Sequence, residues 1–151
     1  MVDIIEVKSA ELHKEYERIM LESFADQGRD QDEILSEEEG EIWRYLVRMG
    51  DKFIGTGRVA KIKDTFYFQR GSVLKEYRSN GIFAVSLKMG VDWIYTFKKP
   101  AEKIAIFVNI FSKTPAEKVG FKVDYEHPSR VANSPLIYYK AYHDRKVQGS
   151  A

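Results

Sequence analysis

The order of candidate helices and strands along the sequence predicts an α/β fold with a mixed sheet. Three observations indicate this class: three consecutive strand-like segments separated by turn residues, a long segment with apolar residues at helical spacing, and a continuously apolar segment after it. Strands joined by short turns run antiparallel, whereas two strands joined through a helix run parallel with a right-handed crossover. We therefore expect a twisted sheet that combines an antiparallel N-terminal meander with a parallel central pair, flanked by helices.

The N-terminal segment predicts a strand followed by a helix. Ile4, Ile5 and Val7 form the short strand candidate, and the helix is expected to begin near Ser9. Apolar residues recur in this helix at helical spacing, so one of its faces should be buried. These residues are Leu12, Tyr16, Ile19, Met20 and Phe24.

Three strand candidates and the turns between them form the antiparallel meander. Gly50 with Asp51, and Lys63 with Asp64, supply the turn chemistry. The three strands cover residues 42–47, 53–62 and 65–74.

The segment after the meander predicts the helix and the strand of the parallel unit. A helix is expected from about residue 81 to residue 97, where two apolar stripes predict burial on two sides. Residues 104–108 are continuously apolar, which suits a strand covered on both faces. A capping box with a proline then begins a short helix at residues 114–117. Two final strands are expected at residues 121–125 and 136–142.

Composition excludes several classes of function. Lys and Arg total 24 against 23 Asp and Glu, a net charge of +1, so no overall field favours nucleic acid or an anionic membrane. The chain has no cysteine, which excludes disulfides, thiolate nucleophiles and Cys-containing zinc sites. His13, His127 and His143 are too scattered for a metal site and are interpreted as surface residues. With neither a signal-peptide pattern nor a segment of membrane-spanning length, we expect one cytoplasmic domain over residues 1–151.

The segment 73–82, between the last meander strand and the long helix, holds the candidate chemistry. A helix N-terminus presents free backbone N–H groups and the positive end of the helix dipole, and both favour a phosphate. Gly81 would let a phosphate approach the backbone, and Arg78 would add a positive charge. The alternative is that Asn80-Gly81 forms an ordinary turn before the helix.

This segment resembles the acyl-CoA signature of the GNAT N-acetyltransferase superfamily. A valine-ended strand runs into Tyr-Arg-x-x-Gly-Ile, with Asn109 and the run 117–121 downstream resembling the second motif of that superfamily. The resemblance extends along nearly the whole chain and implies a GNAT-like acyl-CoA N-acyltransferase fold. It also implies a reaction without a metal, in which a primary amine of a small molecule or a peptide directly attacks acetyl-CoA or another acyl-CoA. The residues of the first motif are Val73, Tyr77, Arg78, Gly81 and Ile82.

By this resemblance, the donor is bound mostly through backbone groups. The backbone of Val73 and Leu74, on a strand that separates from the next one, would pair with pantetheine. Arg78 would contribute charge, and Asn109 and Ser112 would also contact the donor. The amides that would hold the CoA pyrophosphate belong to six consecutive residues, Ser79, Asn80, Gly81, Ile82, Phe83 and Ala84.

The sequence departs from the family in the pyrophosphate loop, where Phe83 replaces a small residue. A ring that faced the phosphates would weaken binding. The spacing of Phe83 with Leu87, Val91 and Ile94 instead favours a position in the core.

A second departure affects catalysis. The tyrosine that usually protonates the departing thiolate maps onto Ala116, and residues 65–74 contain no glutamate to act as the base. Tyr125 is our candidate acid and Glu76 our candidate base. Tyr138, His127, water and the acidic residues described next are the alternatives.

The acceptor side has both acidic and basic candidates. Residues 22–41 include nine acidic residues and one basic residue, Arg29, and we hypothesise that they attract a cationic amine. A solvated helix face is the alternative. Arg44, Arg58 and Arg70 would suit a carboxylate on the acceptor, so an amino acid or a peptide end would satisfy both patches.

Two other functions remain open. The chain could be a non-catalytic acyl-CoA-binding or regulatory module, because Phe83 and Ala116 depart from the family. It could also accept the acyl group from an acyl carrier protein. A homodimer is left open as well.

Overall fold

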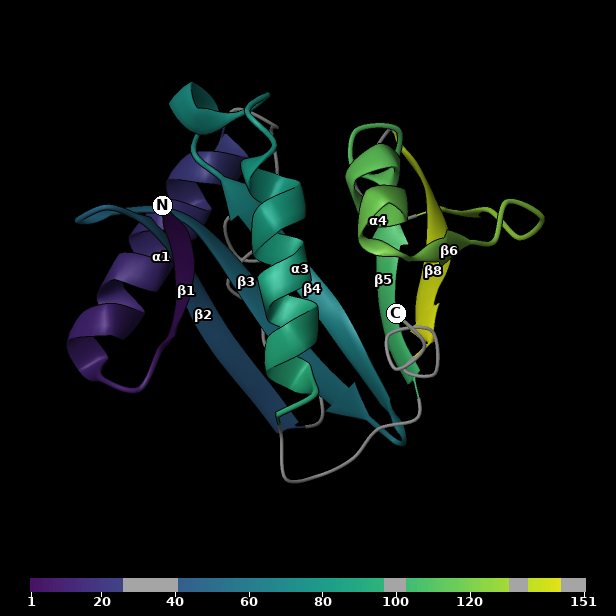
Figure 1. The fold of residues 1–151 in the computed structure, drawn as a ribbon, viewed down its shortest axis with the longest axis horizontal. Coiled ribbons are helices and arrows are strands. Elements are labelled where there is room, and N and C mark those ends of the chain that lie inside the picture. Colours follow the sequence, from purple (N-terminus) through teal and green to yellow (C-terminus); the bar gives the residue numbers. More distant parts are fainter. Residues whose placement is uncertain (26–40, 97–102, 131–135, 145–151) are drawn as a thin grey trace.

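The computed structural model describes residues 1–25, 41–96, 103–130 and 136–144, in which helices flank an eight-stranded sheet. Figure 1 views this sheet from the side that α3 and α4 cover. Within the described residues, no helix is both long and apolar enough to cross a membrane. The elements are β1 (Val2–Glu6), α1 (Ala10–Ala25), β2 (Glu41–Met49), β3 (Lys52–Ile62), β4 (Thr65–Val73), the 3-10 turn η1 (Lys75–Tyr77), α3 (Ile82–Ile94), β5 (Lys103–Val108), α4 (Lys113–Val119), β6 (Lys122–Val123), β7 (Ser129–Arg130) and β8 (Ile137–Asp144).

The sheet is mixed, which confirms the fold class that the sequence predicts. Its strand order is β1-β2-β3-β4-β5-β8-β6, with β7 attached to β8. Strands β1 to β4 pair antiparallel as a meander, β4 and β5 pair parallel, and β8 pairs antiparallel with both β5 and β6. The crossover through α3 therefore places the parallel pair in the middle of the sheet.

Helix α1 packs on the face of the sheet opposite α3. Its first turn is capped, because the Leu12 N–H donates to Ser9 Oγ at 3.1 Å and so satisfies one of the N–H groups that lack a helical partner. Its apolar side packs against Leu46 and Leu74. The residues that α1 buries are Tyr16, Ile19, Met20, Ser23 and Phe24, which confirms the predicted apolar face.

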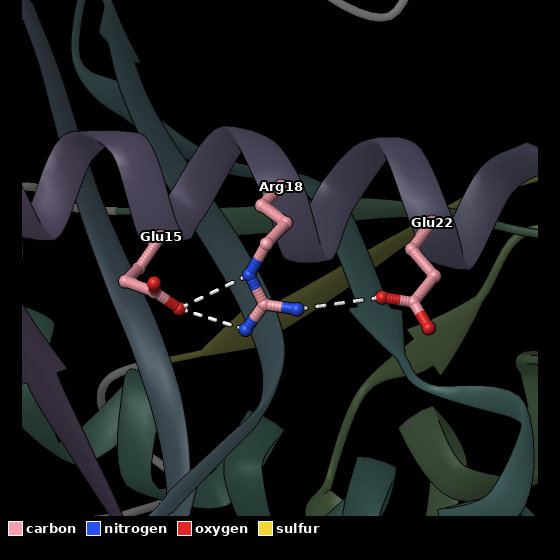
Figure 2. A network of polar contacts seen from close by, with 3 residues as sticks. All are labelled: Glu15, Arg18 and Glu22. Carbon is pink, nitrogen blue, oxygen red and sulfur yellow. Dashed lines mark hydrogen bonds and ion pairs between the residues drawn. The ribbon is translucent and has the colours of Figure 1, made fainter.

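The solvent side of α1 carries a small ionic network (Figure 2). Arg18 lies between two carboxylates, with Nη2 2.7 Å from Glu15 Oε2 and Nη1 3.5 Å from Glu22 Oε2. The hydrogen bond that Arg18 donates to Glu15 raises the pKa of Arg18. All three side chains are exposed to water, so each pair contributes less than about 1 kcal/mol to stability.

Helix α3 packs closely on the other face because glycine and aromatic residues meet there. A Cβ placed on Gly90 would lie 2.6 Å from Cε1 of Phe68, so only glycine lets the helix approach this ring. The Tyr45 ring lies over Gly57 in the same way, and burial raises the pKa of its phenol. The core here combines Phe66, Phe68, Ile104 and Ile106 of the sheet with Ile82, Leu87, Val91 and Ile94 of α3.

Several element ends differ from the expected ones. The helix predicted to reach residue 97 ends at Ile94, where Thr96 donates from both its N–H and its hydroxyl to the Trp93 carbonyl oxygen, at 2.9 and 2.6 Å. Residue 97 itself lies outside the described residues. The strand predicted at 121–125 is reduced to the two residues of β6, and β7 was not predicted.

Candidate functional site

Strands β4 and β5 form a fork at the centre of the sheet. Their parallel pairing runs from Thr65 opposite Lys103 to Phe68 opposite Ile106, and the described register contains no pair beyond this one. Strand β4 nevertheless continues to Val73 and β5 to Val108, so the two strands separate toward their carboxyl ends (Figure 1). We call the two segments that no longer pair with each other, residues 69–73 of β4 and 107–108 of β5, the fork.

A bulge in β4 marks the point where the strands separate. Its pairing with β3 shifts between Thr56 opposite Ser72 and Arg58 opposite Gln69, which leaves one extra residue on β4. Bulges bend a strand and increase its twist. The bulge thus turns the end of β4 away from β5 and helps to open the fork.

Val73 presents backbone groups to the open side of the fork. The Leu74 N–H donates to the Ile54 carbonyl of β3 at 2.8 Å, and the Leu74 carbonyl accepts the Tyr77 N–H at 2.9 Å. Peptide groups of successive strand residues point to opposite sides, so the Val73 N–H and C=O point away from β3. Of the two residues predicted to pair with pantetheine, Val73 has the suitable orientation, whereas Leu74 is bonded within the chain.

The N-terminus of α3 lies beside the end of β4 and has no side-chain cap. Its first helical hydrogen bond runs from the Val85 N–H to the Gly81 carbonyl at 3.1 Å, so the N–H groups of Ile82, Phe83 and Ala84 precede the helical ladder. Gly81 has a φ of 74°, in the left-handed region, and a Cβ placed on it would meet nothing within 4 Å. The end of the helix therefore combines free donors with open space, as a phosphate site requires.

Arg78 connects the fork to α1. Its Nε donates to the Val73 carbonyl at 2.8 Å, and its Nη2 donates to the Ser23 carbonyl in the last turn of α1 at 2.7 Å. A cation at a helix C-terminus is stabilised by the helix dipole. The guanidinium, predicted to add positive charge for a phosphate, therefore joins the end of β4 to the last turn of α1.

Phe83 packs against the core rather than over the end of α3, as its spacing predicts. The side chain is half-buried and lies against the main core. Its ring borders the bulge of β4, because a Cβ placed on Gly71 would lie 3.1 Å from Phe83 Cε2. The ring therefore forms part of the fork's wall on the α3 side, and no side chain caps the first turn of the helix.

Asn109 and Ser112 shape the turn between β5 and α4. Asn109 Oδ1 accepts the N–H groups of Phe111 and Ser112 at 2.9 and 3.2 Å, while Ser112 Oγ accepts the Asn109 N–H at 3.0 Å. This arrangement presents Ile110 and Phe111 to solvent, 61% and 74% exposed. The pair was not singled out in the sequence, although two adjacent large apolar residues in a turn after a buried strand are a detectable signal.

The two candidate catalysts have different surroundings. The Tyr125 hydroxyl donates to Glu117 Oε1 of α4 at 2.8 Å, and this bond raises the pKa of the phenol. Glu76 lines an open depression of about 570 Å³ whose other walls include Glu11 and Lys52, on the α1 side of the molecule. Ala116, at the usual position of the acid, is completely buried.

The face of β4 toward α1 is polar, although its opposite face is apolar. Three side chains follow one another on this face, and each has a hydrogen-bond partner on another strand of the sheet. Gln69 Oε1 accepts Arg58 Nε at 3.0 Å, Ser72 Oγ lies 2.6 Å from Thr56 Oγ1, and the Tyr67 hydroxyl accepts a hydrogen bond from β8. This polar row borders the fork on the side that α3 leaves free.

Part of the predicted acceptor side lies outside the described residues. Of the nine acidic residues in the segment 22–41, only Glu22 and Glu41 are described, and both are exposed. Arg44 is half-buried and Arg58 is buried, while the side chain of Arg70 is not described.

The three histidines do not all lie on the surface, which corrects the sequence-based interpretation. His13 and His127 are partly or fully exposed and lie 2.7 and 2.8 Å from Glu17 and Asp124. His143 is buried, and its Nδ1 lies 3.0 Å from the Tyr95 hydroxyl. Alternating side chains on β8 turn this residue inward, a direction that its identity alone did not indicate. A carboxylate–histidine group in an exposed turn, Asp124, Glu126 and His127, has ligand atoms within 4.8 Å of one another.

Comparison with known proteins identifies the fold. Protein-family models give no match, and curated proteins give none either. Among solved structures, an acyl-CoA N-acyltransferase from Pseudomonas aeruginosa is 8% identical with a TM-score of 0.77, over 95% of this chain and 99% of that one.

The names of two other solved structures give an acceptor, and one of them also gives bound coenzyme A. A spermidine N-acetyltransferase chimera of Vibrio cholerae SpeG and hSSAT is 13% identical with a TM-score of 0.72, over 99% of both chains. The ribosomal L7/L12 alpha-N-protein acetyltransferase RimL, in complex with coenzyme A, is 12% identical with a TM-score of 0.66, over 93% of both chains. At these identities the likeness concerns the fold, which is that of the GNAT N-acetyltransferases.

Proposed function

We propose that the protein is an N-acyltransferase that moves a short acyl group, most simply acetyl, from coenzyme A to a primary amine in the cytoplasm. One observation is the main support: the fork presents the Val73 N–H beside an uncapped helix N-terminus with open space at Gly81. An extended thioester with a diphosphate at its far end matches both features. No side chain caps the start of α3, so no cap has to be displaced for the diphosphate to bind there.

Donor binding would use the two features together. The N–H groups of Ile82, Phe83 and Ala84 would bind the diphosphate, with the helix dipole adding to its attraction. The Val73 N–H would hold the pantetheine arm along β4. RimL, which has the same fold, was crystallised with coenzyme A, and this supports the choice of donor.

The reaction would be direct transfer. The neutral amine attacks the thioester carbonyl, the oxyanion of the tetrahedral intermediate accepts hydrogen bonds from backbone N–H groups in the fork, and the C–S bond then breaks. The new amide loses the amine proton to water, and the thiolate takes up a proton. An unperturbed thiol has a pKa near about 8.5, so the thiolate departs without a strong acid, which is compatible with the buried Ala116.

The first test is binding and thiol release. We expect calorimetry to detect binding of acetyl-CoA, and a thiol-release assay against amines, amino acids and peptides to show turnover. The variant Val73→Pro removes the N–H that faces the fork without removing a bond to β3 and should lower kcat/KM for acetyl-CoA at least about ten-fold. Val73→Ala keeps the N–H and is the control, with folding of both checked by circular dichroism. Equal thiol release by the two variants would contradict the role of this N–H.

The absence of an acid at Ala116 favours one second candidate, a module that binds acyl-CoA without catalysis. It predicts calorimetric binding of acetyl-CoA with no thiol release from any amine in the panel. Preference for an acyl carrier protein over acyl-CoA in competition would instead identify the carrier as donor. Size-exclusion chromatography tests whether the protein is a homodimer.

A further inference from the structure

A lysine enclosed by aromatic rings lies on the sheet face opposite α3. The Nζ of Lys140, on β8, is 5.1 Å from the ring centre of Tyr67, 5.9 Å from that of Phe107 and 5.1 Å from that of Tyr142. The Tyr67 hydroxyl also accepts a hydrogen bond from this Nζ at 3.1 Å. We call these four residues the Lys140 cluster. Three rings from three strands hold one ammonium group in a fixed position.

The charge of Lys140 is not neutralised within the described residues. Its contacts are with aromatic rings and tyrosine hydroxyls, and none of them is a carboxylate. Hydrogen bonds with Tyr142 and Tyr67 raise the pKa of the ammonium, so it remains charged at neutral pH. A second ammonium, that of Lys103, lies 5.8 Å from the centre of the Tyr142 ring. The cluster therefore presents positive charge and aromatic surface together.

The Lys140 cluster lies at the closed end of the fork. Lys140 is opposite Phe107, the first β5 residue beyond the last β4–β5 pair, and Tyr67 immediately precedes that pair on β4. Side chains alternate along each strand, and Phe66, Phe68 and Ile106 pack in the core under α3. The cluster accordingly faces the other side, where the row of Tyr67, Gln69 and Ser72 borders the fork.

This location separates the two substrates. In the proposed function the donor occupies the end of the fork beside α3, so the amine must reach the thioester from the opposite face. We propose that the Lys140 cluster binds a carboxylate of the acceptor, which makes the preferred acceptor an amino acid or a short peptide. From Phe68 to Val73 the strand spans about 16 Å at about 3.3 Å per residue. The carboxylate would bind at the closed end of this stretch and the thioester would lie along it. The acceptor's amine and carboxylate can therefore be no more than about this distance apart. The inference rests on the proposed function, because the fork defines the face.

A second copy of the chain fits this surface less well. The rings of Phe107 and Tyr142 are partly exposed, 44% and 37%, and could in principle pack against a partner. A two-fold interface would place the same patch on both subunits and so bring Lys140 and Lys103 close to their own copies. Repulsion between these like charges opposes such an interface. A carboxylate ligand relieves this repulsion instead.

The test compares acceptors that differ only in the carboxylate. Each amino acid in the thiol-release panel is paired with its amide, glycine with glycinamide and leucine with leucinamide. We expect the unmodified protein to prefer the free acids, and Lys140→Met to raise KM for the acids at least ten-fold while leaving KM for the amides and for acetyl-CoA unchanged. Lys140→Arg keeps the charge and should restore KM for the acids to within about three-fold. The matched control is Lys61→Met, which removes a lysine of β3 whose Nζ lies 5.7 Å from the centre of the Phe66 ring on β4. This variant should leave KM unchanged for the acids, the amides and acetyl-CoA.

Binding measurements separate this inference from the proposed function. N-acetylglycine and N-acetylglycinamide serve as product-like probes in calorimetry, and only the acid should bind more weakly to Lys140→Met. If Lys140→Met loses affinity equally for the acid and the amide, or for neither, the carboxylate site is overturned while coenzyme A binding is unaffected. A change from dimer to monomer in Lys140→Met would overturn it in favour of a subunit interface. Failure of the unmodified protein to bind coenzyme A, with the acid probe still bound at Lys140, would overturn the proposed function alone.

Discussion

The N-termini of α1 and α3 are built from the same backbone groups but are completed differently. The first turn of α1 is capped by Ser9 Oγ, which accepts the Leu12 N–H, whereas the first turn of α3 has no side-chain cap and begins at a glycine with positive φ. A cap stabilises a helix by about 1 kcal/mol, so its absence at α3 is a cost to stability. The comparison shows that a side chain completes the start of α1, whereas the start of α3 leaves its first N–H groups without a side-chain acceptor.

The largest effect should follow from filling the space at the start of α3. Gly81→Leu places a side chain where the diphosphate would bind and should weaken acetyl-CoA binding at least about ten-fold in calorimetry. Gly50 is a matched control, since it has a similar φ of 63° and equally open surroundings in the turn between β2 and β3. Gly50→Leu should cost the same roughly 1–2 kcal/mol of backbone strain in urea unfolding. Equal acetyl-CoA affinity in the two variants would show that the helix end is not the donor site.

Removing the cap of α1 should affect stability alone. Ser9→Ala leaves the Leu12 N–H without its acceptor and should lower the free energy of unfolding by about 1 kcal/mol, measured by urea denaturation. The KM for acetyl-CoA should not change. Ser9→Asp keeps an acceptor and is the control. A change in KM for Ser9→Ala would mean that the two helix ends are not independent.

A charge added beside α3 should move stability and binding in opposite directions. Asn80→Asp places a carboxylate near the positive end of the helix dipole, which should stabilise the folded protein by about 0.3–1 kcal/mol. The same carboxylate should repel the diphosphate and weaken acetyl-CoA binding about two- to five-fold. Thermal melting and calorimetry measure the two effects on one sample. If affinity is unchanged while stability rises, the phosphates bind elsewhere.

The smallest effect should come from the side chain first considered as the acid. Backbone groups at α3 and Val73 would act on the substrate directly, whereas the Tyr125 hydroxyl is already bonded to Glu117. Tyr125→Phe should therefore change kcat by less than about two-fold at neutral pH. The companion variant is Glu117→Gln, which removes the negative charge of the group that accepts this hydrogen bond. A ten-fold loss in Tyr125→Phe alone would restore this tyrosine as the proton donor.

Local patterns predicted much of the fold because local forces determine it. The helical spacing of Phe83 with Leu87 and Val91 correctly indicated the buried side of α3, and the apolar run 104–108 correctly indicated the central parallel strand. The short strands β6 and β7 were misjudged or missed, since two residues contain too little periodicity to be recognised.

The site was less predictable because its contacts join distant parts of the chain. Arg78 reaches a carbonyl 55 residues away in α1, and Lys140 reaches a hydroxyl 73 residues away on β4. No spacing rule connects residues so far apart. The burial of His143 likewise depends on the register of β8 against β5, which the sequence of β8 does not encode by itself.

Recognition by main-chain amides, which the proposed function requires, would have an evolutionary consequence. Peptide N–H groups at Val73 and the first turn of α3 are present whatever side chains those positions carry, apart from proline, and only Gly81 is tied to a particular residue by its dihedral angle. Selection on such a pocket can preserve geometry while nearly every letter drifts. Solved structures of this shape can accordingly share as little as 8% of their residues with the chain while no family profile detects it.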